Sequence, residues 1–162
     1  MNSIKIGQKI ISLKNRPYFI ADIGSNHDGD LNRALKLIEL AKESGADCVK
    51  FQNFKASTIV SEWGFEKLNT KFSHQSKWNK SVYETYSDAE TKLNWTKILK
   101  EKCDEVGIEY MTSPYDLESV DYVNEYLNAF KIGSGDITWD LIIEKISKKK
   151  KPVIIASGAS NL

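Results

Sequence analysis

Short apolar segments alternate with amphipathic segments along most of this chain. Residues 18–24 are rich in strand-forming side chains and end in a Gly-Ser-Asn turn. The next segment, residues 30–45, places leucine, isoleucine and alanine at helical spacing, with Asp30 as the predicted N-cap and Gly45 as the stop. This pattern predicts a buried strand followed by an amphipathic helix.

The same strand–helix pair recurs along the chain. The further predicted strands lie at 46–52, 108–113, 129–135 and 151–158, and the further predicted helices lie at about 90–106, 116–125 and 137–147. Strands that alternate with helices at short spacing form parallel sheets joined by right-handed crossovers. The chain is therefore predicted to be an α/β protein with about five parallel strands and four helices. A small hairpin at about 4–13, turning at Gly7, precedes them.

One connection is much longer than the others. The second and third predicted strands end 61 residues apart, whereas the other successive strand ends are 20 to 28 residues apart. The extra segment, at about 54–89, is too aromatic for a disordered linker. We interpret this insertion as an ordered flap that forms a lid, with a surface for an oligomer partner as the alternative. Its seven aromatic residues are Phe54, Trp63, Phe65, Phe72, Trp78, Tyr83 and Tyr86.

Polar side chains stand at the carboxyl end of every predicted strand. Lys50 and Gln52 are two positions apart in one apolar strand, so they share a face. A lysine that faces the interior is costly unless an anion meets it. In parallel α/β folds, functional groups gather at this end of the sheet. The other polar residues at the strand ends are Asp22, Ser113, Lys131, Ser134, Asp136 and Ser157.

This set of residue types predicts an anion site. Two lysines, several hydroxyls and glycines that expose backbone N–H groups suit a phosphate or a carboxylate. Asp22 and Asp136 add carboxylates that suit sugar hydroxyls, the water of a metal ion, or proton transfer. The alternative is that Lys50 and Lys131 are structural ion-pair partners of these two aspartates, and both interpretations can hold in one site.

Composition and charge narrow the function classes. With a net charge of +1 there is no reason to expect a nucleic-acid partner, and the basic run 148–151 suits a helix end. No signal peptide and no apolar run of about 18 residues occur, so we expect a cytoplasmic protein without a membrane partner. Cys48 and Cys103 are expected as buried thiols, and His27 and His74 as hydrogen-bonding scaffold residues rather than ligands.

The strand-end motifs together resemble the sialic acid synthase family. The segments IADIGSNHDGDL, GADCVKFQ, TSPYD, FKIGSGDI and KPVIIASGAS occur in that family's order and approximate spacing, from about residue 18 to residue 162. The resemblance implies a catalytic domain of the (β/α)8 TIM-barrel type, followed by an antifreeze-like C-terminal domain. Because such a barrel needs roughly 200 residues or more, this chain is expected to hold about five strands and four helices of it.

The resemblance also implies a reaction. Family members condense phosphoenolpyruvate with the open-chain aldehyde of an N-acyl hexosamine, classically N-acetylmannosamine, using Mn²⁺ or Mg²⁺. The products are a nonulosonic (sialic-type) acid and phosphate, in cell-surface carbohydrate biosynthesis. By resemblance, the substrate-binding residues are Lys50, Gln52, Ser113, Lys131, Ser134 and Ser157, and the catalytic residues are Asp22 and Asp136.

The chain departs from the family pattern at several of these positions. Asp22 and Asp136 stand where glutamate is common, so each carboxylate is one methylene shorter. Ser113 replaces a frequent threonine and keeps the hydroxyl. Ala156 stands where many members have serine, for which the adjacent Ser157 can substitute. The shorter carboxylates bear on the size or acyl group of the sugar more than on the type of reaction.

The chain stops soon after its fifth predicted strand. We therefore expect an N-terminal portion of a longer enzyme, inactive alone, whose metal-binding histidines lie beyond Leu162 and whose full-length form is a homodimer acting on small molecules. Two alternatives stay open. One is another phosphoenolpyruvate-dependent deoxy-sugar acid synthase with a phosphorylated aldose as acceptor, for which a second basic cluster would be needed. The other is a non-catalytic, anion-binding barrel fragment.

Overall fold

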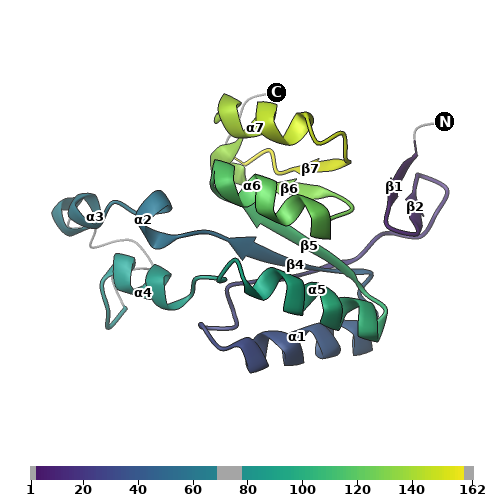
Figure 1. Ribbon diagram of the computed structural model, residues 1–162, viewed down its shortest axis with the longest axis horizontal. Coiled ribbons are helices and arrows are strands. Elements are labelled where there is room, and N and C mark those ends of the chain that lie inside the picture. The colour runs from purple at the N-terminus through teal and green to yellow at the C-terminus, as the bar shows by residue number, and fades with distance from the viewer. Residues whose placement is uncertain (1–2, 69–77, 159–162) are drawn as a thin grey trace.

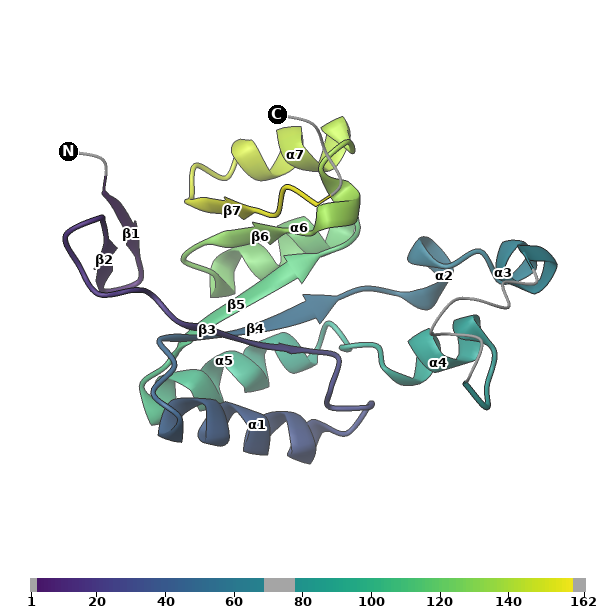
Figure 2. The ribbon, with the colours of Figure 1, turned by 180° about the vertical axis from the view of Figure 1, so that it is seen from behind.

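The computed structural model describes residues 3–68 and 78–158, which form an α/β structure (Figure 1). Three strands form one parallel sheet: β3 (Ile20–Gly24), β4 (Cys48–Asn53) and β5 (Glu109–Pro114). Two more, β6 (Phe130–Ile132) and β7 (Val153–Ile155), form a parallel pair beside β5 (Figure 2). The five predicted strands are confirmed.

These strands do not close into a barrel within the described residues. The outermost strands β3 and β7 each pair with one described neighbour only, in the order β3-β4-β5 and β6-β7. The arrangement of parallel strands with helices outside them is consistent with a part of a (β/α)8 barrel. Both outer strands leave backbone groups that a further strand of such a barrel would pair.

Four helices make the crossovers: α1 (Leu31–Glu43), α5 (Trp95–Val106), α6 (Leu117–Val123) and α7 (Asp140–Ser147), with a 3₁₀ turn at Asn124–Tyr126 after α6. Asp30 caps α1 as predicted, because its side chain accepts hydrogen bonds from the backbone N–H groups of residues 32 and 33. Gly107 ends α5 in the left-handed region, at φ 73°. The four predicted helices are confirmed.

Two helices begin later than predicted. Helix α5 starts at Trp95 instead of about residue 90, because the side chains of Glu90 and Thr91 bond to Ala56 and His27 and hold residues 90–94 outside the helix. Helix α7 starts at Asp140 instead of residue 137. There, Ser134–Asp136 forms a 3₁₀ turn, which also ends β6 earlier than predicted.

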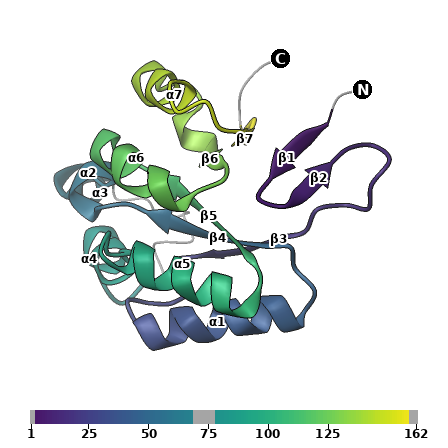
Figure 3. The same cartoon turned by 45° about the vertical axis from the view of Figure 1, so that its right-hand side comes forward.

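The sheet has two different faces. Its outer face packs on the crossover helices through a large apolar cluster that includes Val49, Phe51 and Tyr110. The inner face carries a smaller cluster of Ile6, Cys48, Met111 and Ala129. Ile6 belongs to the predicted hairpin, which forms as β1 (Ile4–Ile6) and β2 (Lys9–Ile11) and turns at Gly7 (Figure 3). The hairpin therefore covers the amino-terminal half of the inner face.

The predicted insertion is ordered where it is described. It contains α2 (Ala56–Ile59), α3 (Glu62–Leu68) and α4 (Val82–Asp88), which lie beyond the carboxyl end of β4 (Figure 1). Ring contacts connect it to the sheet: Trp78 packs on Tyr86, Tyr86 on Phe54, and Phe54 on Tyr115. Phe72 lies outside the described residues. The interpretation as a lid stays a prediction.

Several smaller predictions are confirmed. Cys48 and Cys103 are both buried free thiols, and burial raises the pKa of Cys48 to about 12. At the end of α7, Lys148 pairs with Glu144 at 2.6 Å and Lys149 pairs with Asp121 at 2.5 Å. The basic run is thus a charge-paired helix end. Among the helices of the described segments, none is long and apolar enough to cross a membrane.

Candidate functional site

The candidate site occupies the carboxyl-terminal half of the inner face. Side chains two apart on a strand share a face. Four predicted site residues each lie two positions after a residue that belongs to the inner apolar cluster or packs on it. The polar half of the face is thus a continuation of the apolar half. The pairs are Ile20 and Asp22, Cys48 and Lys50, Met111 and Ser113, and Ala129 and Lys131.

Lys50 is a buried cation with a partner. Its side chain is only 9% exposed, and the parallel register places it beside Asp22. Lys50 Nζ donates a hydrogen bond to Asp22 Oδ1 at 2.6 Å, so the ion pair considered from the sequence is confirmed. The Asp22 side chain is 62% exposed. Lys50 can therefore exchange this partner for an oxyanion of a ligand at low cost, because the released carboxylate stays in contact with water.

Lys131 stands on the same face without such a partner. Its Nζ donates to the backbone carbonyl oxygen of Ile132 at 2.5 Å. Burial lowers the pKa of Lys131 and the Lys50 charge lowers it further, while Asp22 and Asp136 act in the opposite direction. None of the ion pairs between described residues includes Lys131, so a direct ion pair with Asp136 is not formed, although the charges of the two groups still act on each other. A half-buried cation of this kind attracts anions.

Asp136 and Tyr115, a tyrosine that the sequence interpretation missed, both lie close to Gly133. A Cβ placed on Gly133 would lie 2.9 Å from Asp136 Oδ2 and 3.1 Å from the Tyr115 hydroxyl oxygen, so both groups approach where Gly133 has no side chain. Burial raises the pKa of Asp136, against the opposing effect of Lys131. Burial, followed by the charges of Asp136 and Asp22, raises the pKa of Tyr115 to about 12. The sequence could have indicated Tyr115 as a site residue, because it follows the last residue of β5 directly.

Gln52 and Ser113 also come together at this end of the sheet. They are register partners in β4 and β5, and Ser113 is buried. Gly24 lies close to them at φ 55°, and a Cβ there would lie 3.6 Å from Asp22 Oδ1 and 3.7 Å from Gln52 Oε1. The end of β3 therefore lies beside the Asp22 and Gln52 side chains, and its left-handed backbone at Gly24 favours glycine there.

The two remaining predicted residues lie at the edge of the site. Ser134 is exposed and sits against Gly158, where an added Cβ would come within 2.7 Å of the Ser134 Cβ. Ser157, next to Gly158, is exposed as well. The structure thus brings Ser134 to the end of β7 and leaves both hydroxyls accessible. Within the described residues, neither serine forms a hydrogen bond with Lys50 or Lys131.

His27 supports the site from behind, as predicted. It is fully buried, its Nε2 lies 2.8 Å from Thr91 Oγ1, and the Gly29 backbone N–H donates to its Nδ1 at 3.1 Å. With Nδ1 as an acceptor, the Nε2–H of the neutral ring donates to Thr91. Burial lowers the pKa of His27, which favours this neutral form. His27 therefore fastens the turn after β3 to the end of the insertion; His74 lies outside the described residues.

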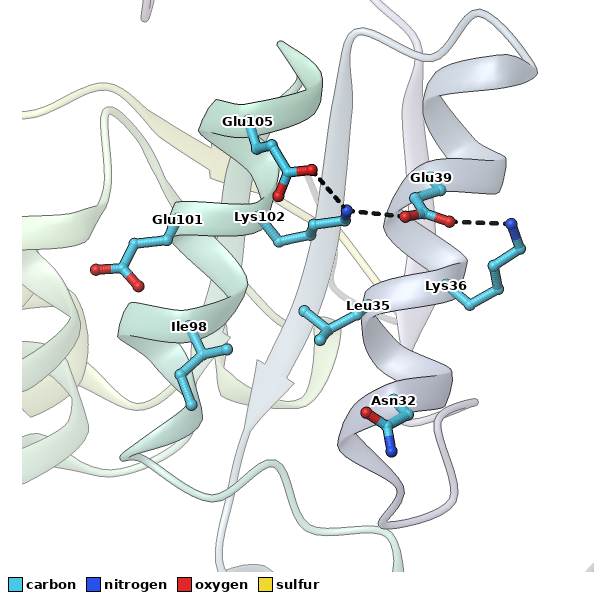
Figure 4. Close-up of a pocket in the computed structure, with 8 residues that line it drawn as sticks. All are labelled: Asn32, Leu35, Lys36, Glu39, Ile98, Glu101, Lys102 and Glu105. Carbon is cyan, nitrogen blue, oxygen red and sulfur yellow. Dashed lines mark hydrogen bonds and ion pairs between the residues drawn. The ribbon is translucent and has the colours of Figure 1, made fainter.

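A groove on the outer surface has a different character. It measures about 500 Å³ and lies between α1 and α5. Figure 4 shows Lys102 between two carboxylates, with Nζ 2.8 Å from Glu39 and 3.0 Å from Glu105, while Lys36 pairs with the other side of Glu39 at 2.9 Å. These charges satisfy one another, and the groove faces away from the strand ends. It is not part of the candidate site.

Comparison with known sequences gives a consistent set of relatives. The chain is 42% identical over 147 residues to the N,N'-diacetyllegionaminic acid synthase of Campylobacter jejuni, covering 88% of this chain and 42% of that protein. It is 35% identical over 147 residues to the human N-acetylneuraminate-9-phosphate synthase, covering 90% of this chain and 40% of that protein. The chain thus spans less than half the length of these curated relatives.

The solved structures agree. The N-acetylneuraminic acid synthetase of Leptospira borgpetersenii, crystallised with citrate, superposes with a TM-score of 0.82 at 27% identity, over 99% of this chain and 51% of that chain. Such structural neighbours are synthases of the TIM-barrel type. The family model of the NeuB family matches residues 37–162. With this match, the motifs and the fold in agreement, the chain belongs to the NeuB family of sialic acid synthases.

Proposed function

We propose that this chain is part of an enzyme that condenses phosphoenolpyruvate with the open-chain aldehyde of an N-acyl hexosamine. The observation that carries the proposal is a pair of lysines on one face at the strand ends: Lys50, which is buried, and Lys131, which is half-buried. Two cations in a poorly solvated site suit a ligand with two anionic groups, such as the phosphate and carboxylate of phosphoenolpyruvate. Relatives named as synthases of nonulosonic acids support this ligand.

The proposed reaction forms one carbon–carbon bond. C3 of phosphoenolpyruvate attacks the aldehyde carbon, and the aldehyde oxygen takes up a proton to become a hydroxyl. Water adds to the cationic C2 and gives up one proton. Phosphate then leaves with cleavage of the C2–O bond and takes up the proton of the new C2 hydroxyl, which becomes the C2 ketone. Asp136 suits the proton donor, because burial raises its pKa and keeps it protonated to higher pH than an ordinary aspartate.

The remaining residues are proposed to position the two substrates. Asp22 holds Lys50 until the anion arrives and then lies beside the reacting carbons. Gln52, one pleat beyond Lys50, contacts the sugar. Ser113, Ser134 and Ser157 donate hydroxyl hydrogen bonds to the phosphate and carboxylate. Hydroxyl donors at a poorly solvated oxyanion site add hydrogen bonds to the charge attraction.

Metal and partners belong to the full-length protein in this proposal. Among the described residues no group of three or more His, Cys, Asp or Glu side chains is placed to hold a metal ion. We propose that the ligands of the Mn²⁺ or Mg²⁺ ion lie beyond Leu162. We further propose a cytoplasmic homodimer that acts on small molecules in cell-surface carbohydrate biosynthesis.

A phosphate-release assay on the full-length gene product tests the proposal. It combines phosphoenolpyruvate, Mn²⁺ and a panel of N-acyl hexosamines, with a phosphorylated aldose as the competing acceptor. Lys50→Ala should abolish turnover, because the anion loses its buried cation. Lys97→Ala is the matched control: this lysine lies on α5 with a side chain that is 66% exposed, and its loss should leave the rate unchanged. Near-normal turnover of Lys50→Ala would refute the assignment of the anion site.

A further inference from the structure

Tyr115 brings a phenol hydroxyl to the candidate site that has no role in the reaction as described above. The residue follows β5 directly, and its backbone N–H donates to the Asn53 carbonyl oxygen at 2.9 Å. Its ring packs edge-on against Phe54, with centroids 6.3 Å apart and planes at 87°. The hydroxyl itself makes no hydrogen bond within the described residues and is not fully enclosed. The backbone and the ring are thus held in place, while the hydroxyl is available to a ligand.

The hydroxyl lies on the face that carries the lysines. Gly133 is extended, with φ −66° and ψ 158°, and follows Lys131 by two residues, so a side chain on Gly133 would lie on the face of Lys131. The Tyr115 hydroxyl oxygen lies 3.1 Å from the position that its Cβ would take, and Asp136 Oδ2 lies 2.9 Å from it. The two oxygens are therefore no more than about 6 Å apart. One ligand oxygen between them can hydrogen-bond to both, because O–H···O bonds span about 2.5 to 3.0 Å.

The two groups can treat such an oxygen differently. Burial, followed by the charges of Asp136 and Asp22, raises the pKa of Tyr115 to about 12, so the phenol keeps its proton at neutral pH. Burial raises the pKa of Asp136 from that of an ordinary aspartate, which is still far below the pKa of the phenol. Asp136 therefore suits a group that gives its proton away, and Tyr115 a group that donates a hydrogen bond without losing its proton.

We propose that Tyr115 is a further catalytic residue, whose hydroxyl donates a hydrogen bond to the aldehyde oxygen of the acceptor while the carbon–carbon bond forms. The inference rests on the proposed function. As C3 of phosphoenolpyruvate bonds to the aldehyde carbon, an electron pair of the C=O bond moves to the oxygen, which takes up the proton of Asp136. The Tyr115 hydrogen bond is strongest while this oxygen carries partial negative charge, so it stabilises the transition state more than the bound substrate.

Tyr115→Phe in the full-length gene product removes the hydroxyl and keeps the ring against Phe54. With phosphoenolpyruvate, Mn²⁺ and the N-acyl hexosamine that the wild type uses best, phosphate release should show a kcat lowered about 30-fold. This is less than the roughly 100-fold to 1,000-fold loss for a donor to a full oxyanion, because proton transfer from Asp136 limits the charge. The KM for phosphoenolpyruvate and the melting temperature should stay unchanged. Tyr122→Phe is the matched control, since it removes a phenol hydroxyl from α6 at a residue that is 39% exposed, and it should keep the wild-type kcat.

The pH profile of kcat separates a contact with the substrate from an effect on Asp136. The rate should fall as pH rises through the pKa of Asp136, because the proton donor is then lost. The other groups that act on the pair are intact in the variant: Lys131, Asp22 and Tyr86. In Tyr115→Phe this fall should occur at the same pH as in the wild type.

Three results would overturn this inference alone. They are a wild-type kcat in Tyr115→Phe, a pH profile displaced to higher pH, which would show that the hydroxyl bonds to the Asp136 carboxylate instead, and a lower kcat that is accompanied by a lower melting temperature. Wild-type enzyme that releases no phosphate with any acceptor overturns the proposed function as well.

Discussion

Replacing Gly133 with alanine tests whether the positions of the Asp136 carboxylate and the Tyr115 hydroxyl matter for catalysis. Gly133 has φ −66°, a conformation that alanine adopts without strain, so the effect of the change is steric. The new Cβ would lie 2.9 Å from Asp136 Oδ2 and 3.1 Å from the Tyr115 hydroxyl oxygen, whereas ordinary contacts begin near 3.4 Å. The carboxylate must therefore retreat by about 0.5 Å and the hydroxyl by about 0.3 Å.

This displacement is expected to change the stability of the fold little and to slow the reaction if Asp136 is the proton donor. Both displaced atoms are at the ends of side chains, which can rotate away at little cost in stability. Misplacement of a reacting group by about 1 Å can cost roughly 100-fold in rate. A shift of half that size is expected to lower kcat about tenfold in the full-length gene product, with an unchanged KM for phosphoenolpyruvate. Steady-state phosphate release and thermal unfolding measure the two effects.

The same turn offers a matched control. Gly135 lies two residues away, and a Cβ there would meet nothing within 4 Å. Gly135→Ala should therefore leave both kcat and the melting temperature unchanged. If Gly133→Ala keeps the wild-type kcat while its melting temperature is also unchanged, the displaced carboxylate and hydroxyl do not take part in the reaction.

Two further predictions concern stability and pH. Burial acts to raise the pKa of Asp47, but the hydrogen bonds from Lys9, the Phe19 backbone N–H and Arg16 have the larger combined effect and lower it. The stability that these bonds give is therefore present above the unfolded pKa near 3.9 and is lost as pH falls. Asp47→Asn should cost about 2 kcal/mol at pH 7 and less at pH 3 in thermal unfolding; an equal cost at both values contradicts this. For Asp136 the sign is opposite: its raised pKa means that wild-type stability falls as pH rises through about 4 and above. Asp136→Asn should therefore raise the melting temperature at pH 7 while it lowers kcat, and a lower melting temperature would show that the carboxylate stabilises the fold.

Much of the fold follows from local patterns in the sequence. Apolar segments and helical stripes predicted the five parallel strands, the crossover helices and the hairpin, because each pattern reflects which face of an element is buried. The alternation of strand side chains placed Lys50 and Gln52 on one face. The ends of α5 and α7 were predicted less well, because bonds from Glu90 and Thr91 to distant residues, and the turn at Ser134–Asp136, override helix propensity.

The candidate site shows the same limit. The strand ends carry polar residues that can be recognised one by one, and the structure brings most of them to one face. Two features depend on tertiary contacts that no local pattern contains. Tyr115 and Asp136 both approach Gly133, where no side chain fills the space, and Lys131 has a carbonyl oxygen as its hydrogen-bond partner instead of the expected aspartate.

The two halves of the inner face depend on each other. The hairpin buries Ile6 against Cys48, Met111 and Ala129, and this contact keeps water from the amino-terminal half of the face. Lys50 stands two residues beyond Cys48 and opposite Met111 on the neighbouring strand, so one side of it is poorly solvated and its attraction for an anion is stronger than in water. Because the strands that form the apolar cluster also carry the two lysines, packing in the first half sets the electrostatics of the second. The hairpin is therefore expected to contribute to anion binding at the candidate site, although it lies at the opposite end of the strands.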